Sequence, residues 1–232
     1  MSISVIIPAY HEAENLRELL PKLKSVLLEI GHPYEVIIVD TVIKTDDTDE
    51  VCNINGCTYV NREQGNNYGD AIRTGIGRAS HKYTVVMDAD GSHNPNDIEK
   101  FYANIGKGYD LIIGSRYVHG GNSHNGIILK IMSYALNITY RVIFKIKAKD
   151  VSNSFRMYRT DQIKRLRLHC DNFDIVQEII IKLLKTVSPF RLLEVPVFFD
   201  QRKHGESKRE LGKFVLSYLL TIKRLLEIQN EN

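Results

Sequence analysis

The chain has 232 residues, 43% of them hydrophobic and 25% charged, with a formal net charge of +3. This composition is that of an ordinary globular protein, and the small net charge gives no reason to expect nucleic-acid binding. The three cysteines have neither metal-ligand spacing nor the even number of a disulfide framework, so we expect reduced thiols in a cytoplasmic protein. No apolar stretch reaches the roughly 20 residues that span a bilayer, so a soluble or peripheral protein is expected.

The first half of the sequence alternates short apolar runs with amphipathic helical patterns. In chain order, strands are predicted at residues 3–10, 34–40, 57–60, 83–90 and 110–116, and helices at 12–30, 68–79 and 96–107. Strands that are apolar throughout and alternate with helices are typical of a parallel sheet covered on both faces. The predicted fold class is therefore α/β, with a mainly parallel sheet flanked by helices.

The second half has a different character. In chain order, the pattern predicts a loop at 119–126, an apolar helix-compatible segment at 127–149, a strand-like run at 191–200, a polar loop at 201–210 and a final amphipathic helix at 211–229. The sequence contains no repeat, low-complexity tract or linker. We therefore predict one domain over residues 1–232, with a nucleotide-sugar-binding half at 1–116 and an acceptor half at 117–232.

Polar residues gather at the predicted carboxyl ends of the strands, where parallel α/β sheets bind their ligands. These residues are Tyr10, Glu12, Asp40, Asp88, Asp90 and Arg116. Asp88 and Asp90 belong to the predicted strand 83–90, in which alternation places them on the same side. Two such carboxylates can bind Mg²⁺ or Mn²⁺ together with water and substrate phosphate oxygens. A solvated strand end, or a cap for the next helix, is the alternative interpretation.

Six motifs of the sequence carry a family resemblance. They are VIIPAYHEAENL, YGDAIRTGI, YTVVMDADGSHNP, DLIIGSRYVHGG, SFRMYR and EVPVFFDQRKHGESK. Together they cover residues 3–208, and in this order they resemble family 2 glycosyltransferases, most closely the polyprenyl-phosphate sugar synthases of the dolichyl-phosphate mannose synthase type. The resemblance implies the GT-A fold, a nucleotide-binding α/β sandwich. It also implies metal-dependent, inverting transfer of a sugar from a GDP- or UDP-sugar to a polyprenyl phosphate, such as dolichyl or undecaprenyl phosphate.

The same resemblance implies roles for individual residues. Asp88 and Asp90 would meet Mg²⁺ or Mn²⁺ and the donor diphosphate. The residues implied to hold the nucleotide sugar are Pro8, Tyr10, Glu12, Asp40 and, beside a turn of small residues, Asp70. Arg116, Arg202 and Lys208 match basic positions near the donor and acceptor phosphates, and with Asp90 they form the implied catalytic set. An acceptor phosphate is already anionic at neutral pH, so this reaction needs no strong general base.

The sequence departs from the family pattern in three places. Thr41 stands where the family has the second of two adjacent aspartates, and His11 stands where asparagine is usual. Asp46 or Asp47 could fold back to replace the missing aspartate, or they could simply complement a helix N-terminus. The motif SNSFR also differs from the family form, which makes an acceptor contact by Arg156 less secure than one by the arginine of DLIIGSR.

Two other functions remain open at this point. The same fold could transfer the sugar to a glycan or capsule hydroxyl, for which Asp150, Asp110 and Glu178 are candidate general bases. The chain could also be a non-catalytic, nucleotide-binding regulatory subunit, which only the altered motif of the second strand favours. His93 and His204 are predicted to be solvated or locally hydrogen-bonded, and no aromatic platform accompanies the basic residues to favour nucleic acid.

A polyprenyl acceptor requires contact with a membrane surface, so we expect a cytoplasmic protein that is peripheral to a membrane. Residues 127–147 carry apolar side chains at helical spacing, edged by Lys130, Arg141 and Lys145, and the final helix has a similar pattern. Either segment could instead pack on the sheet as a core helix. The final helix could also dock on a partner membrane subunit.

Overall fold

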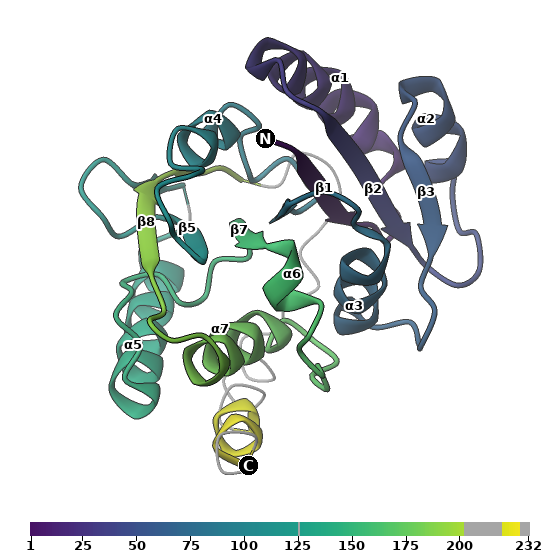
Figure 1. The fold of residues 1–232 in the computed structure, drawn as a ribbon. Coiled ribbons are helices and arrows are strands. Elements are labelled where there is room, and N and C mark those ends of the chain that lie inside the picture. The colour runs from purple at the N-terminus through teal and green to yellow at the C-terminus, as the bar shows by residue number, and fades with distance from the viewer. Residues whose placement is uncertain (125, 202–219, 228–232) are drawn as a thin grey trace.

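The computed structural model describes residues 1–124, 126–201 and 220–227 (Figure 1). Its centre is a seven-stranded sheet with the strand order β3-β2-β1-β4-β7-β5-β8. These strands are β1 (Ile3–Pro8), β2 (Tyr34–Asp40), β3 (Thr58–Asn61), β4 (Tyr83–Val86), β5 (Leu111–Ser115), β7 (Arg156–Arg159) and β8 (Leu192–Pro196). A separate parallel pair is formed by β6 (Asn122–Ser123) and β9 (Phe198–Phe199).

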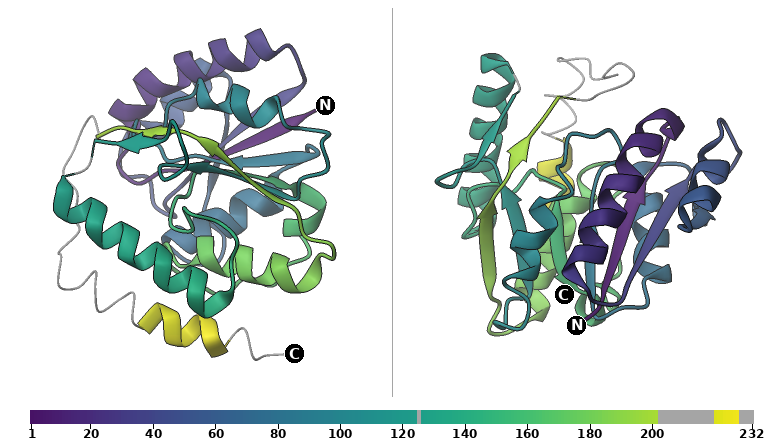
Figure 2. Two further views of the ribbon diagram at one scale, coloured as in Figure 1. Left: turned by 90° about the vertical axis from the view of Figure 1, so that its left-hand side faces the viewer. Right: turned by 90° about the horizontal axis from the view of Figure 1, so that it is seen from above.

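Helices cover both faces of the large sheet (Figure 2). The helices are α1 (Ala13–Ile30), α2 (Thr48–Asn55), α3 (Tyr68–Arg78), α4 (Asp97–Tyr102), α5 (Ile127–Phe144), α6 (Thr160–Ile163) and α7 (Ile175–Thr186). Alternate residues of β1 divide between two cores: Val5 packs with α1, α2 and α4, and Ile6 packs with α3, α5, α6 and α7. This is the doubly covered α/β sheet that the apolar strands predict, so the predicted fold class is confirmed.

One strand runs against the others. β7 lies between β4 and β5 and is antiparallel to both, with Arg156 opposite Val86 of β4 and Ile113 of β5. The remaining pairs in the large sheet are parallel. The sequence pattern did not predict β7, because it is a four-residue strand with an arginine at each end. It also did not predict α7, whose apolar side chains are buried against the sheet.

The prediction that Asp88 and Asp90 belong to a strand over residues 83–90 is wrong. β4 ends at Val86, so both aspartates lie in the irregular loop that follows the strand rather than in the strand itself. Strand alternation therefore does not orient their side chains. Their directions are set by the hydrogen bonds of the loop, which the next subsection describes.

Helix α5 was expected within residues 127–149 and runs from Ile127 to Phe144. Its buried side includes Asn137, Tyr140 and Phe144, which lie on the sheet, while several apolar residues on its other side are exposed. Of the final predicted helix, residues 220–227 are described and helical, with Leu225 buried in the core beside α7. Within the described ranges, the longest and most apolar helices still fall short of what crossing a membrane requires.

Candidate active site

The predicted polar residues meet along one edge of the sheet. β1, β2 and β4 are parallel, so the segments that follow them emerge at the same edge, and these segments contain Tyr10, Thr41 and Asp88. β5 has the same direction as β4, because both are antiparallel to β7, and it brings Arg116 to this edge. The carboxyl edge of the sheet therefore gathers side chains that are far apart in the sequence.

Asp88 is oriented by three neighbours. The Ser154 hydroxyl donates to Asp88 Oδ2 at 2.8 Å, and the Tyr68 hydroxyl donates to Asp88 Oδ1 at 3.3 Å. Burial raises the pKa of Tyr68, and the nearby Asp88 carboxylate raises it further, so this phenol remains a donor at neutral pH. The backbone N–H of Asp88 donates to His93 Nδ1 at 3.0 Å. The carboxylate is thus held in place while 20% of the side chain stays exposed.

The Asp90 side chain forms a short turn with Ser92. Its Oδ1 accepts hydrogen bonds from the backbone N–H and the hydroxyl of Ser92, at 3.0 and 2.6 Å. Gly91, between them, has a φ of +78°, a left-handed conformation that favours glycine. In the described part of the chain, Asp90 Oδ2 makes no hydrogen bond, so this oxygen can accept a ligand.

The donor set fits a hard divalent cation that keeps most of its shell from water and substrate. No group of three or more His, Cys, Asp or Glu side chains with metal-binding geometry occurs among the described residues. Mg²⁺ is commonly held by one or two carboxylates plus phosphate oxygens, which Asp88 and Asp90 can provide for it or for Mn²⁺. A site closed entirely by protein ligands does not fit these residues.

His93 stabilises this loop through its hydrogen bond with the Asp88 backbone. It is almost fully buried, with its ring stacked on Phe155 at 4.7 Å between centroids. Because Nδ1 accepts from the Asp88 N–H, the proton lies on Nε2, which faces Asn153 Oδ1 at 3.2 Å. The prediction that His93 is locally hydrogen-bonded is therefore confirmed.

Asp40 is the last residue of β2 and is buried at the carboxyl edge of the sheet. The residue is fully buried, and its carboxylate accepts from the Thr41 N–H at 2.7 Å and from the Tyr59 hydroxyl at 3.2 Å. Burial raises the pKa of Asp40 despite these hydrogen bonds. A direct contact of Asp40 with a nucleotide stays a prediction, as do the roles of Pro8, which ends β1, and of Glu12, whose carboxylate accepts from Asn15 at 2.5 Å.

The two acids that follow the altered motif have different partners. Asp46 folds back onto the start of α1, where it accepts from the Ala13 N–H at 3.0 Å, and it also accepts from the Thr48 N–H at 3.1 Å. Asp47 forms an exposed ion pair with Arg17 at 3.2 Å. Asp46 thus joins the N-termini of α1 and α2. Both acids line a hollow of about 360 Å³ together with His11, Ala13, Glu14, Asn15 and Arg17.

Asp70 is the N3 residue of the capping box of α3. It accepts from the Asn67 N–H at 2.9 Å in a capping box at the start of α3, and it pairs with Arg73 at 2.5 Å. Burial would raise the pKa of Asp70, but these hydrogen bonds and the Arg73 charge hold it below its ordinary value. Gly69 is required here, because a Cβ would lie 2.1 Å from the carbonyl oxygen of Cys170. The carboxylate of Asp70 therefore has a structural task, and its predicted contact with the nucleotide sugar remains untested.

Arg62 is a buried cation that the sequence analysis missed. It follows β3, and its guanidinium donates to the carbonyl oxygens of Ala9, at 2.6 Å, and Asn66, at 2.5 Å. Burial lowers the pKa of Arg62, although the Asp40 charge opposes this effect. The only signal in the sequence was a lone arginine just after a weak strand. Its contact with Ala9 ties the loop after β1 to the loop after β3.

Arg116 is the best-defined cation of this edge. Its Nε and Nη2 donate to the two oxygens of Asp150, both at 2.8 Å, and Nη2 also donates to the Ser152 hydroxyl at 2.8 Å. The guanidinium lies 5.4 Å from the ring centroids of both Tyr117 and Phe199. Burial would raise the pKa of Asp150, but the charge and hydrogen bonds of Arg116 hold it below its ordinary value. Asp150 is therefore the anchor of Arg116.

The other two candidate general bases, Asp110 and Glu178, also have hydrogen-bond or ion-pair partners. Asp110 precedes β5 and so lies at the opposite edge of the sheet, where it accepts from Gln162 and from the Arg191 N–H. Glu178 is buried in α7, where it accepts from the backbone of residues 169 and 170 and pairs with Lys182 at 2.7 Å. With Asp150 bound to its arginine, all three candidates have structural partners.

Arg156, whose acceptor contact the altered motif made less secure, has a structural role. It is fully buried and donates to three backbone carbonyl oxygens, those of Val151, Asn153 and Val176. It stabilises the segment before β7, and a contact of Arg156 with an acceptor stays untested. Arg202, Lys208 and His204, from the polar loop, lie outside the described residues, so their predicted roles are not tested.

The seven-stranded sheet and its covering helices form the GT-A fold. The model of the family described as "Glycosyl transferase family 2" matches residues 4–167, and the chain therefore belongs to the family 2 glycosyltransferases. The family resemblance of the six motifs and the predicted enzyme class are thus confirmed.

Particular relatives are also similar to this chain. The dolichol-phosphate mannosyltransferase of Pyrococcus furiosus is 35% identical over 238 aligned residues, covering 100% of this chain, which spans 65% of that protein's length. The polyprenol monophosphomannose synthase of Mycolicibacterium smegmatis is 28% identical, with 88% of this chain and 79% of that protein covered. Among solved structures, glucosyl-3-phosphoglycerate synthase from Mycobacterium tuberculosis, in complex with Mn²⁺, UDP and phosphoglyceric acid, superimposes with a TM-score of 0.76. It is 17% identical, and the match covers 100% of this chain and 79% of that one.

Proposed function

We propose that this protein transfers a sugar from a nucleoside diphosphate sugar to a polyprenyl phosphate. The observation that carries the proposal is the carboxyl edge itself, where Asp88 and Asp90 face the site and Arg116 is fixed by Asp150. The two relatives named for polyprenyl or dolichol phosphate mannose synthesis support the acceptor class. The donor is a GDP- or UDP-sugar.

Different residues of the chain would have different roles in such a reaction. Asp88 and Asp90 would hold Mg²⁺ or Mn²⁺, which neutralises the negative charge that develops on the leaving diphosphate. The Tyr68 and Ser154 hydroxyls fix the direction of the Asp88 carboxylate. Arg116, which Asp150 fixes at this edge, would bind a phosphate, since an arginine fork suits phosphate oxygens.

The acceptor class also fits the lack of a free base among the candidates considered. A hydroxyl acceptor requires a group that removes its proton. Asp150, Asp110 and Glu178 are each held by hydrogen bonds or an ion pair, so none of them is placed for this task. A phosphate acceptor attacks as an anion, and a single displacement with inversion at the anomeric carbon then follows.

Contact with a membrane completes the proposal. The outer side of α5 exposes an apolar stripe of five residues: Ile127, Ile131, Tyr134, Ile138 and Val142. Such a stripe, edged by basic residues, suits the interface of an anionic bilayer. We therefore expect salt-sensitive sedimentation with anionic liposomes, reduced when Lys130, Arg141 and Lys145 are changed to glutamine. A partner membrane subunit that docks on the final helix remains a second route to the bilayer.

The test of the proposed function is a transfer assay. Purified protein is incubated with radiolabelled GDP- or UDP-sugars, Mn²⁺ and polyprenyl phosphate in detergent, and the phases are then separated. Label in the organic phase supports the proposal. Label in a water-soluble product would favour a glycan or capsule acceptor, and no transfer from any donor would favour a regulatory subunit.

A further inference from the structure

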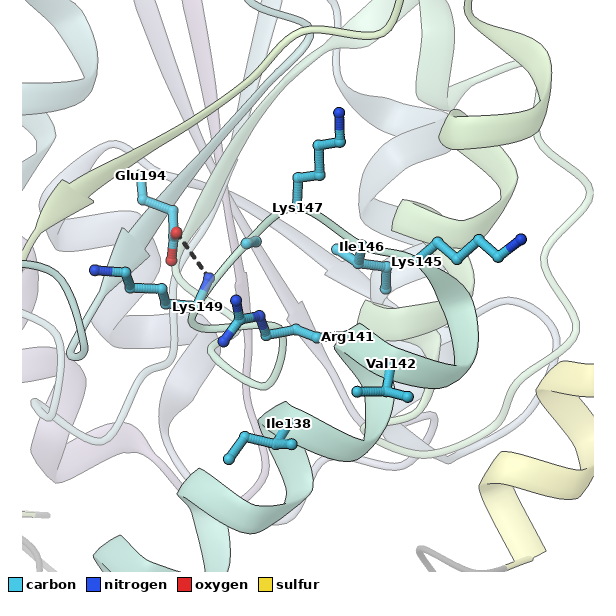
Figure 3. A pocket seen from close by; sticks show the side chains of 9 residues that line it. Ile138, Arg141, Val142, Lys145, Ile146, Lys147, Lys149 and Glu194 are labelled. Atoms are coloured by element: carbon cyan, nitrogen blue, oxygen red, sulfur yellow. Dashed lines mark hydrogen bonds between the residues drawn. The ribbon is translucent and has the colours of Figure 1, made fainter.

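A hollow with a volume of about 580 Å³ lies at the C-terminal end of α5 (Figure 3). The last turns of α5, the segment 145–149 and Glu194 of β8 line it. None of the residues that hold the active-site carboxylates belongs to this lining. Its four cationic side chains are Arg141, Lys145, Lys147 and Lys149.

These four cations have no partner of their own in the described part of the chain, whether a hydrogen bond or an ion pair. Glu194 does not neutralise them directly, because its two oxygens accept the backbone N–H groups of Lys149 and Asp150 at 2.7 and 2.9 Å. In Figure 3, Arg141 and Lys149 reach toward the side of the hollow where Glu194 lies. Unpaired cations around a concave surface attract an anion.

The hollow is continuous with the apolar stripe of α5. Ile138 and Val142 line the hollow, and they are also the last two residues of that stripe. An anion that carried an alkyl chain would therefore find its charged group among the cations and its chain along the helix. Inorganic phosphate would use only the first of these two surfaces.

We propose that this hollow binds the phosphate of an anionic membrane lipid, at a site separate from the active site. The inference rests on the membrane contact of α5 proposed above. Arg141 offers a planar fork to the phosphate oxygens, and Lys149 offers a compact charge beside it. The hollow also adjoins the active site through the backbone, because Asp150, which anchors Arg116, directly follows Lys149.

The experiment measures binding to vesicles without donor sugar or polyprenyl phosphate. Vesicles of phosphatidylcholine alone and vesicles with added phosphatidylglycerol are titrated against the protein, and bound protein is separated by flotation. The double variant Arg141→Gln/Lys149→Gln is compared with Lys22→Gln/Arg165→Gln, which removes the same charges from exposed positions outside the hollow. We expect binding to anionic vesicles about 30-fold weaker for the first variant and at most about threefold weaker for the second.

The fold should survive these changes, because both side chains are exposed and Lys149 contacts Glu194 through its backbone. Equal losses for the two variants would overturn the proposal, since net charge alone would then explain binding. Normal vesicle binding with weakened binding of soluble glycerol phosphate would also overturn it, in favour of a site for a soluble phosphate. The transfer assay of the wild-type protein in detergent is independent of these titrations, so a failure of the proposed function is seen separately.

Discussion

Helices α1 and α5 have 18 residues each, and they present different surfaces to solvent. α1 buries an apolar stripe that includes Leu16, Leu20 and Leu23, and most of its exposed positions are polar or charged. α5 buries Asn137, Tyr140 and Phe144, and it exposes apolar residues such as Ile131. The apolar side of α1 is covered by the sheet and stabilises the fold. The apolar outer side of α5 is not covered in this way and is suited to contact with a membrane.

The buried aspartates near the two helices also differ, in whether a cation pairs with them. On the α1 side, Asp40 is buried, no cation among the described residues is bonded to it, and burial raises its pKa. On the α5 side, Asp150 is buried against Arg116, which holds its pKa low. Asn137 of α5 accepts from the N–H groups of Val151 and Ser152, which follow Asp150. The outward-facing helix is therefore joined to the arginine of the site by a short hydrogen-bonded segment.

The largest expected effect is on sugar transfer, and it should leave the membrane binding proposed for α5 unchanged. Asp90→Ala should reduce transfer by roughly 10³-fold or more and weaken metal-dependent donor binding, because a carboxylate of the metal pair is lost. Removing one of two neighbouring carboxylates also lowers their repulsion, although the turn to Ser92 is lost, at a cost of about 1 kcal/mol. Binding to anionic vesicles should not change.

Asp90→Asn keeps an oxygen for Ser92 and tests the charge alone, and it should be nearly as inactive in the radiolabel assay. Asp161→Ala, at an exposed carboxylate paired with Arg159, is the matched control. Near-normal turnover of the Asp90 variants would show that this carboxylate does not bind the metal.

The next effect concerns the buried pair on the α5 side. Asp150→Asn should lower the free energy of unfolding by about 3–5 kcal/mol, because it removes the buried carboxylate charge that pairs with the mostly buried Arg116 guanidinium. Urea denaturation at neutral pH measures this change. Asp161→Asn, which breaks an exposed pair at 3.4 Å, should change stability by no more than about 0.5 kcal/mol. Equal effects of the two changes would contradict the anchoring role of Asp150.

The helices themselves can be compared by truncation. Leu20→Ala in α1 should lower the free energy of unfolding by about 2–5 kcal/mol, since it opens a cavity in the core. Ile131→Ala in α5 should change it by less than about 0.5 kcal/mol, because this side chain is 63% exposed. Vesicle flotation should show the reverse order, with weaker binding only for Ile131→Ala. If Ile131→Ala were as destabilising as Leu20→Ala, the outer side of α5 would be part of the core.

The smallest effect is a pH dependence at Asp40. Its folded-state pKa is raised above the ordinary value of 3.8, so the folded protein binds this proton more tightly than the unfolded chain does. The charged form therefore destabilises the fold at neutral pH, and this penalty disappears as the pH falls below the folded-state pKa toward 3.8.

Asp40→Asn should accordingly be as stable as the wild type or slightly more stable at pH 7, by less than about 1 kcal/mol, and this difference should shrink on acidification. The asparagine can still accept from the Thr41 N–H, which controls for the lost hydrogen bond. Paired thermal melts across the acid range measure the difference. A variant that loses stability at pH 7 and regains it in acid would show the opposite linkage.

Local pattern was enough to predict most of the first half of the molecule. β2 runs from Tyr34 to Asp40 as expected, and α1 differs from its prediction by one residue. Parallel strands with short connections bring their carboxyl ends to one edge, so the meeting of Tyr10, Asp88 and Arg116 followed from topology alone. The orientation of Asp88 could not be predicted, because Ser154, which holds it, lies 66 residues away in the sequence.

The amino-acid sequence by itself determined the fold class, the family and the carboxyl edge that carries the acidic pair, because these depend on periodicity and on short motifs. Only the tertiary structure decided that β7 inserts antiparallel between β4 and β5, that Asp150 is an anchor for Arg116, and that α5 turns its apolar stripe outward. The physical reason is the same in all three cases. Each outcome depends on contacts between segments far apart in the chain, and the burial and pairing that those contacts produce leave no local pattern.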